Sequence, residues 1–358
     1  MEPEHSDFKP AQSGRIFLPP PGRRTDRLGR RISVVACMGA RGRAEFAGCL
    51  CLFLAGAVAA LCAADRVAPG PPGSLRIGVV SGNWTGVDYN DATAAIAAWA
   101  RTILDQRHIV LAVETRTFDS AGAEREALIS GRVDAVSMLA DQLVDLDPEL
   151  QPDEVFLAAR GNDWTERYAL LARRDSGVED MASLVGKKLV IQANDRTCLA
   201  PQWIDLLLAR GSNGPAADVL GSVSRLQNPS KAVLQVFFRQ ADACVVTSNV
   251  FALSCELNPQ LGKEMRMLAL SPELVPSVFF FRRGYDSEAR KQLEPAMLAL
   301  RDTAAGRQIL TVFQCDEIVK RPLACLESAR QLLREYNRLK ARPGSRSPIV
   351  PPRGGTPL

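Results

Sequence analysis

Residues that could carry acid–base or nucleophilic chemistry are few in this chain. It has two histidines, His5 and His108, in 358 residues. His5 precedes a predicted export signal and His108 lies in a predicted helix-to-strand turn, so neither is placed to activate a serine or a cysteine. Cys198 is the one reactive candidate, because the start of a helix lowers the pKa of a thiol, although an apolar cap or a disulfide is the commoner role. The chain also lacks GxGxxG, P-loop and Cys/His zinc patterns, so the sequence predicts a binding protein that is not an enzyme and carries no cofactor or metal.

Polar residues follow several predicted strands, at positions where helices begin. Free N–H groups at a helix start bind anions, and ligands of open parallel sheets sit at the carboxyl ends of the strands. We therefore expect the ligand-binding residues in four turns: Trp84 and Tyr89; Asn194, Asp195, Arg196 and Thr197; Asn228 and Ser230; and Thr247 and Ser248. Helix capping or plain packing is the competing interpretation at each turn.

The second of these turns has the residue types that suit an oxyanion best. The Thr197 hydroxyl and the N–H groups behind it can donate hydrogen bonds, and Arg196 can supply positive charge. Asp195 works against this reading, because a carboxylate repels an anion. It therefore caps the helix, pairs with Arg196, or meets a cationic end of the ligand.

Strands and helices alternate along the chain in two series, judged from the periods of their apolar residues. The strands expected are 75–80, 109–117, 133–138, 189–192 and 243–246, with extended segments at 265–270 and 278–281. The helices expected are 91–106, 121–130, 199–209, 229–239, 287–301 and 323–339. Such alternation is typical of a parallel sheet covered by helices, and its repetition predicts two similar lobes with a cleft.

An apolar stretch near the amino end, residues 46–64, follows Arg41 and Arg43 and ends in small residues. This is the layout of a secretory signal, and cleavage after Ala64 is expected. An uncleaved membrane anchor is the alternative.

The chain's ends are poor in apolar periodicity. Residues 1–37 are rich in Pro, Gly and Arg, and we interpret them as disordered or as mis-assigned sequence upstream of a start at Met38. Residues 341–358 form a Pro/Gly/Arg tail that is expected to be disordered.

The formal net charge of +4 comes from these ends. Nine Lys/Arg and five Asp/Glu precede Asp65, and five Lys/Arg without any acid follow Tyr336. Residues 65–336 therefore hold 30 Lys/Arg against 35 Asp/Glu, a charge of −5. Nucleic acid is excluded as an expected partner, because phosphate backbones require a basic face.

Five of the nine cysteines follow the predicted signal, at Cys198, Cys244, Cys255, Cys315 and Cys325. An exported protein meets an oxidising compartment, so two disulfides and one thiol are compatible with the count. Cys315 and Cys325 are the favoured pair, since they would close a short loop around Pro322.

A series of motifs in this order resembles the phosphate/phosphite/phosphonate-binding proteins of ABC transporters. The motifs are LRIGVV, EALISGRVDAVSM, MASLVGKKLVIQ, NDRTCLAP and PSKAVLQVFFRQADACVVTSN, spread between residue 75 and about residue 323. The resemblance implies a two-lobed type 2 periplasmic-binding fold, with phosphoryl oxygens held by the turn at 194–197. This chain departs from the family in having Arg196 and Cys198 in that turn, in having Met138 where an aromatic residue often follows the third strand, and in lacking a histidine near Asn228.

The resemblance also implies an organisation and a function. We expect lobe 1 at 75–168, lobe 2 at 169–276, and a return to lobe 1 with C-terminal helices at 277–340, preceded by a signal peptide at 38–64 and a spacer at 65–74. Segments 168–171 and 278–281 are expected to cross between the lobes and to act as a hinge. The expected function is that of a monomeric periplasmic solute-binding protein that delivers a small anion to an inner-membrane ABC permease. A periplasmic sensor that regulates a membrane signalling protein is the alternative.

Overall fold

The computed structural model describes residues 74–83, 94, 112–211 and 216–341. All of them belong to one compact unit, residues 64–358. The predicted signal, most of the helix at 91–106, and the candidate residues Trp84 and Tyr89 lie outside the described residues. Among the helices that are described, none is both long and apolar enough to cross a membrane.

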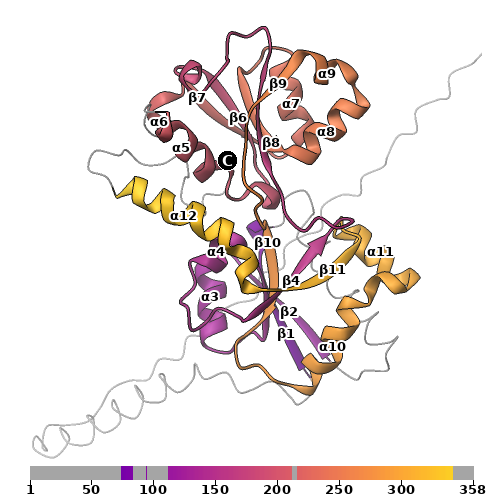
Figure 1. Cartoon of the computed structure of the whole chain (residues 1–358). Coiled ribbons are helices and arrows are strands. Elements are labelled where there is room, and N and C mark those ends of the chain that lie inside the picture. Colours follow the sequence, from indigo (N-terminus) through magenta and orange to yellow (C-terminus); the bar gives the residue numbers. More distant parts are fainter. Residues whose placement is uncertain (1–73, 84–93, 95–111, 212–215, 342–358) are drawn as a thin grey trace, which may run out of the picture. The chain divides into compact units, whose positions relative to one another are not determined.

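One sheet has six strands in the order β11-β4-β10-β3-β1-β2 (Figure 1). The strand β1 pairs in parallel with both β2 and β3, whereas β10 is antiparallel to β3 and β4, and β11 is antiparallel to β4. The strands are β1 Ser74–Val80, β2 Ala112–Phe118, β3 Ala135–Leu139, β4 Glu154–Ala159, β10 Ser277–Phe281 and β11 Glu317–Pro322.

The second sheet has five strands in the order β7-β6-β8-β5-β9. Here β6 is parallel to β7 and β8, and β5 is antiparallel to β8 and β9. The strands are β5 Tyr168–Arg173, β6 Lys188–Gln192, β7 Ser222–Leu226, β8 Ala243–Thr247 and β9 Met265–Leu270.

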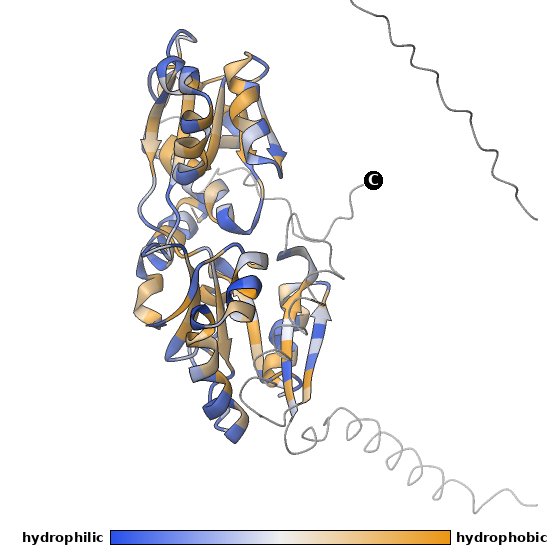
Figure 2. Ribbon diagram, turned by 90° about the vertical axis from the view of Figure 1, so that its right-hand side faces the viewer, coloured by the Kyte–Doolittle hydropathy of each residue, from blue (hydrophilic) through white to orange (hydrophobic). Residues whose placement is uncertain are grey.

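Helices cover both faces of each sheet. The α-helices are α3 Ala121–Ile129, α4 Ala140–Val144, α5 Ala200–Arg210, α6 Ala216–Val219, α7 Pro229–Phe237, α8 Ser248–Leu257, α9 Pro259–Glu264, α10 Glu288–Leu298, α11 Ala304–Val312 and α12 Glu327–Lys340. The short 3₁₀ helices are η1 Ser81–Asn83, η2 Ala182–Leu184, η3 Asp195–Thr197, η4 Leu300–Asp302 and η5 Leu323–Leu326. The central strands are largely hydrophobic, and the helices carry hydrophilic residues outward (Figure 2).

Alternation of side chains along the strands divides the core into layers. In β8, Ala243 and Val245 join one buried cluster, and Cys244 and Val246 join another. Successive side chains of a strand point to opposite faces, so each strand serves two helical layers. This three-layer arrangement is the α/β architecture that the sequence predicts, with two lobes that each contain a sheet flanked by helices.

Two chain segments cross between the sheets, residues 160–167 after β4 and 271–276 after β9. They pair through Glu166 and Leu274, whose backbone N–H groups donate to each other's carbonyl oxygens at 2.7 and 2.9 Å. The segments that the sequence analysis assigned to the crossing, 168–171 and 278–281, are instead parts of β5 and β10. The assignment was wrong because apolar runs of this kind are buried sheet strands, and the true crossings are the irregular segments that precede β5 and β10.

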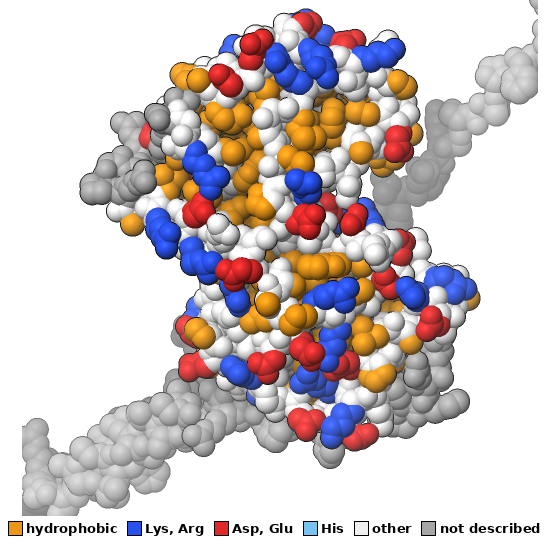
Figure 3. Space-filling view, in the orientation of Figure 1, with side chains coloured by type: hydrophobic (Ala, Val, Ile, Leu, Met, Phe, Trp, Pro, Cys, Tyr) orange, Lys and Arg blue, Asp and Glu red, His pale blue; other side chains and the backbone are white. Residues whose placement is uncertain are grey.

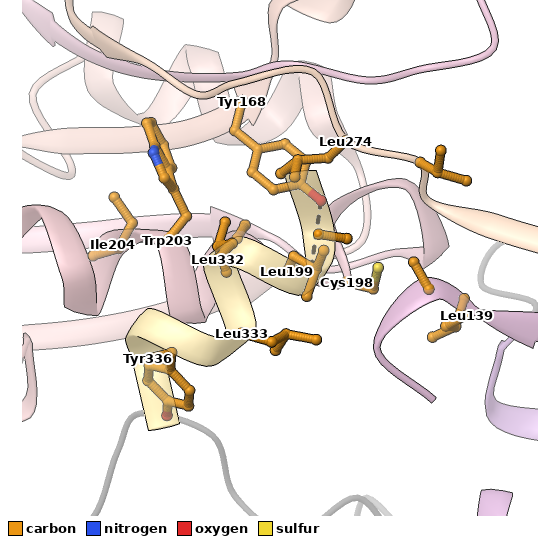
Figure 4. Packing of buried hydrophobic residues seen from close by; sticks show 14 of the residues in the cluster. Leu139, Tyr168, Cys198, Leu199, Trp203, Ile204, Leu274, Leu332, Leu333 and Tyr336 are labelled. Atoms are coloured by element: carbon orange, nitrogen blue, oxygen red, sulfur yellow. Dashed lines mark hydrogen bonds between the residues drawn. The ribbon is translucent and has the colours of Figure 1, made fainter. Parts of the chain in front are cut away.

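The C-terminal helix α12 packs against α4 of the first lobe and α5 of the second. Its buried residues Leu332, Leu333 and Tyr336 join a cluster that also includes Tyr168 and Trp203 (Figure 4). The hydroxyl of Tyr168 accepts a hydrogen bond from the Leu199 N–H at 3.4 Å. The helix α12 therefore contacts both lobes.

The expected disulfide between Cys315 and Cys325 is absent, and both carry thiols. Strand β11 lies between them, and six extended residues span about 20 Å. A disulfide requires Cα atoms within about 7 Å, so the extended strand keeps the two thiols apart. The sequence interpretation failed because it placed a turn where the chain forms an edge strand.

Candidate ligand-binding site

Three of the predicted polar turns lie at one edge of the five-stranded sheet. Strands β6, β7 and β8 are parallel, and their last residues are in register, with Gln192 opposite Leu226 and Ile191 opposite Val245. The turn at 194–197, the start of α7 and the start of α8 follow these three strands directly. The sequence-predicted residues from 194 to 248 are therefore brought together along the carboxyl edge, where α/β proteins bind ligands.

The turn at 194–197 is held by its own side chains. Thr197 is buried, and its hydroxyl donates to the carbonyl oxygen of Gln192 at 2.6 Å while accepting from the Asn194 N–H at 3.3 Å. The single hydroxyl hydrogen is thus directed at the backbone of β6. This geometry gives Thr197 the task of fixing the turn that presents Asp195 and Arg196.

Arg196 joins this turn to a crossing segment. Its guanidinium donates to a carboxylate oxygen of Glu166 at 2.6 Å, and its other terminal nitrogen lies 3.4 Å from the Gln314 carbonyl oxygen. The Glu166 side chain is only 7% exposed, and its second carboxylate oxygen is buried without a hydrogen-bond partner among the described residues. The buried Glu166 carboxylate, which lies where the two crossing segments pair, is therefore linked directly to the turn at 194–197.

Asp195 sits in the same turn with a carboxyl group that is partly removed from water. Burial raises its pKa, while the charges of Arg196 and Arg160 and the N–H groups of Asp195 and Arg196 oppose the rise. These N–H groups already face the Asp195 carboxylate. Together with Glu166, that carboxylate offsets the positive charge of Arg196, so the turn has no large excess of positive charge.

A cavity of about 190 Å³ adjoins Asp195 and Arg196. The other polar residues of its described lining are Asn83, Ser137 and Ser277. Most of the lining comes from the six-stranded sheet and from α10, η4 and α11. The apolar residues that line it are Ile77, Val79, Met138, Leu139, Phe156, Ala158, Trp164, Pro276, Val278, Phe279, Met297, Leu300, Leu310, Phe313 and Ile318.

Of the remaining predicted residues, Asn228 and Thr247 are helix N-caps, and Ser230 and Ser248 lie in the first turns of α7 and α8. The Asn228 side chain accepts from the Lys231 N–H at 3.0 Å, and Ser230 beside it is exposed. The Thr247 hydroxyl accepts from the Val250 N–H at 3.4 Å, and the Ser248 N–H donates to the Arg167 carbonyl oxygen at 2.7 Å. None of these four is among the described residues that line the cavity, whereas Met138, Asp195 and Arg196 are.

Several lining residues were not foreseen from the sequence. Asn83 exchanges two amide hydrogen bonds with Gln142, at 2.9 and 3.0 Å, and so connects η1 with α4 at the carboxyl edge of the first sheet. Its position directly after β1 was the available signal. Trp164 and Phe279 had no local signal, because one lies on a crossing segment and the other in a strand that returns late in the chain.

Catalytic and metal chemistry find little support among the described residues. No group of three His, Cys, Asp or Glu residues there could hold a metal. The Cys198 thiol is buried 3.3 Å from the Pro276 carbonyl oxygen, a position suited to packing between α5 and a crossing segment. Over the visible face, acidic and basic side chains are interspersed (Figure 3), in keeping with the low net charge of residues 65–336.

Comparison with known proteins extends this picture. The family model described as "ABC transporter, phosphonate, periplasmic substrate-binding protein" matches residues 89–321, more than half of the chain. No curated protein sequence matches the chain.

Solved structures share the fold at low sequence identity. XAC2383 from Xanthomonas citri, bound to ATP, is 16% identical with a TM-score of 0.54, covering 75% of this chain and 98% of its own. The binding-protein component of an ABC phosphonate transporter (PA3383) from Pseudomonas aeruginosa is 13% identical with a TM-score of 0.51, covering 75% and 88%. PhnD1 from Prochlorococcus marinus, in complex with methylphosphonate, is also 13% identical with a TM-score of 0.51, covering 75% and 99%. The chain belongs to the family of periplasmic substrate-binding proteins of ABC phosphonate transporters.

Proposed function

We propose that this protein binds a small oxyanion of the phosphonate class at the mouth of the cavity, beside Arg196, and presents it to an inner-membrane ABC permease. The observation that carries the proposal is the Arg196–Glu166 contact, because it joins the ligand turn of one sheet to a segment that crosses between the sheets. The bound chain is a monomer in this proposal, exported by its amino-terminal signal.

Electrostatics explain how binding is coupled to closure. In the structure Arg196 is partly exposed, at 23%, so an incoming oxyanion can reach its guanidinium without unfolding the turn. The anion then competes with Glu166 for the N–H groups of Arg196 and weakens the contact between the turn and the crossing segment. Movement about residues 160–167 and 271–276 brings the lobes around the ligand, and the permease reads the closed form.

The direct test is calorimetric titration of the purified protein with phosphate, phosphite, methylphosphonate, sulfate and ATP. We expect heat of binding with methylphosphonate and a loss of at least tenfold in affinity for Arg196→Gln. The matched control is Arg239→Gln, an exposed arginine that pairs with Asp175 away from the cavity. Absence of binding by every ligand of the panel, or equal affinities in the two variants, contradicts the proposal.

Closure has a separate readout. Small-angle scattering should show a smaller radius of gyration when methylphosphonate is added in excess, and the same measurement gives the molecular mass of the species. An unchanged radius at saturation would remove closure from the proposal while leaving the binding site in place.

A further inference from the structure

The cavity contrasts sharply with a site built for a bare inorganic oxyanion. Its charged residues, Asp195 and Arg196, are at one end, and the interior is lined by side chains of the buried cluster between the six-stranded sheet and α10 and α11. Val79, Leu300 and Leu310 are each no more than 5% exposed. A hydrated anion such as phosphate gains nothing from such walls, because its oxygens need hydrogen-bond donors.

An apolar space of this kind is costly when it is empty. Side chains that line a void lose contacts on one side, and the cost rises with the cavity volume. Water fills a cavity only where two or more polar groups can bind it, and most of the described lining is apolar. An apolar group in this space would restore the lost contacts.

We infer that the ligand is an amphiphilic anion whose oxyanion head lies at Arg196 and whose apolar group fills the cavity. The inference rests on the proposed function, since it uses the same site for the head group. An apolar cavity of about 150 Å³ in another protein holds benzene, so about 190 Å³ fits a group of roughly six carbons. The charges around the turn, in which Glu166 and Asp195 offset Arg196 and the neighbouring Arg160, sum to zero, and this favours a singly charged head over a doubly charged one.

The lining also fits a ligand with two chemically different ends. Asn83, Ser137 and Ser277 add neutral polar groups to it, and Trp164 and Phe279 add aromatic rings. Neutral donors can bind the oxygens of the head, and the aromatic rings can contact the first atoms of the apolar group.

A chain-length series tests this inference. Methyl-, butyl-, hexyl- and phenylphosphonate are titrated into the purified full-length protein, in parallel with methane-, butane- and hexanesulfonate. Each methylene that enters the cavity should raise the affinity about fourfold, and the gain should level off near six carbons. The heat-capacity change of binding should become more negative with each added methylene.

The matched variants are Ala158→Phe and Ala112→Phe. Ala158 lines the cavity from β4 and is exposed, so a larger side chain there fills the cavity without overpacking the core. Ala112 is equally exposed on β2 and is not among the lining residues, so it controls for the surface change. Ala158→Phe should abolish the chain-length gain, whereas Ala112→Phe should keep both this gain and the affinity for methylphosphonate.

The outcomes separate the two proposals. Binding of methylphosphonate with no gain on lengthening, or a gain that survives Ala158→Phe, overturns the apolar-group inference and leaves the proposed function intact. A chain-length gain with sulfonates alone supports the inference and removes phosphonates as the ligand class. If no member of either series binds, both proposals are wrong.

Discussion

Two buried arginine–carboxylate pairs show how the same chemistry serves different purposes in this protein. Arg76 of β1 contacts Asp134 through three hydrogen bonds of 2.7 to 2.9 Å, and both carboxylate oxygens are engaged. Arg196 contacts Glu166 through one hydrogen bond of 2.6 Å, and the second oxygen of Glu166 has none. The Arg76–Asp134 pair occupies both carboxylate oxygens, although Arg76 Nη1 is buried without a hydrogen-bond partner among the described residues, whereas the Arg196–Glu166 pair leaves one carboxylate oxygen open.

Position explains the difference. Asp134 precedes β3 and holds Arg76 of the neighbouring parallel strand, so this pair fixes one sheet, and neither residue is among the described lining of the cavity. The hydrogen bond that Arg76 donates to Asp134 is the main reason that the pKa of Arg76 is raised. Glu166 belongs to a crossing segment and Arg196 to the turn after β6, so their contact joins elements that would move in the proposed closure. A pair with three hydrogen bonds gives rigidity, and an incomplete pair with one hydrogen bond leaves Arg196 able to exchange Glu166 for a ligand.

The largest effect is expected for Asp134→Asn, which leaves the Arg76 charge buried without its counter-ion. Loss of one partner of a buried pair costs about 3–5 kcal/mol, measured here as the free energy of unfolding in urea. Ligand affinity should be unchanged. A variant in which Arg76→Met is added should recover much of the loss; if it does not, the pair is not the source of the stability.

A buried carboxyl with no partner extends the comparison. Glu124 of α3 is fully buried, neither of its oxygens has a hydrogen-bond partner among the described residues, and burial raises its pKa to about 8. Because the folded pKa lies above the unfolded one of 4.5, its stabilising contribution is complete below pH 4.5 and is lost as the pH rises toward 8.

Glu124→Gln should therefore raise the free energy of unfolding at pH 8 by about 2–4 kcal/mol, with little effect at pH 4. Urea unfolding at both pH values measures this difference. A gain of equal size at pH 4 would show that Glu124 acts through packing rather than through its ionisation.

The sequence predicted more of the fold than of the site. Strands β1, β6 and β8 are short apolar runs buried on both faces, and such runs are readable without a structure. Strands β4, β5, β7 and β11 were missed. Strands β7 and β11 are at sheet edges and mix polar with apolar residues, so their pairing depends on distant neighbours, whereas β4 and β5 are apolar runs inside the sheets that were not recognised as strands. Likewise Asp195 and Arg196 lie in a strand-to-helix turn that can be recognised in the sequence. The cavity, however, is assembled by β4, β10 and α11, and no local sequence pattern indicates that these elements meet.

Arg196→Met probes the incomplete pair and should have a smaller effect on stability than Asp134→Asn, because Arg196 is partly exposed. We expect a loss of about 1–3 kcal/mol, since Glu166 remains buried and loses its counter-ion. In a double-mutant cycle with Glu166→Gln, the losses of unfolding free energy in the two single variants should be less than additive. Ligand affinity should fall in Arg196→Met and in the double variant. Additive losses would mean that the contact does not stabilise the turn.

The smallest effect is expected at the start of α7, where Asn228 lies at the same sheet edge as Arg196 but serves as a cap. Asn228→Ala removes the hydrogen bond from the Lys231 N–H and should cost about 1 kcal/mol. Asn228 is exposed and is not among the described residues that line the cavity. The ligand affinity measured by calorimetry should therefore stay within about twofold of that of the unmodified protein. A tenfold change would correspond to about 1.4 kcal/mol of binding free energy. A tenfold loss would place the start of α7 in the ligand site, so that this turn and the turn at 194–197 would both contribute to ligand binding.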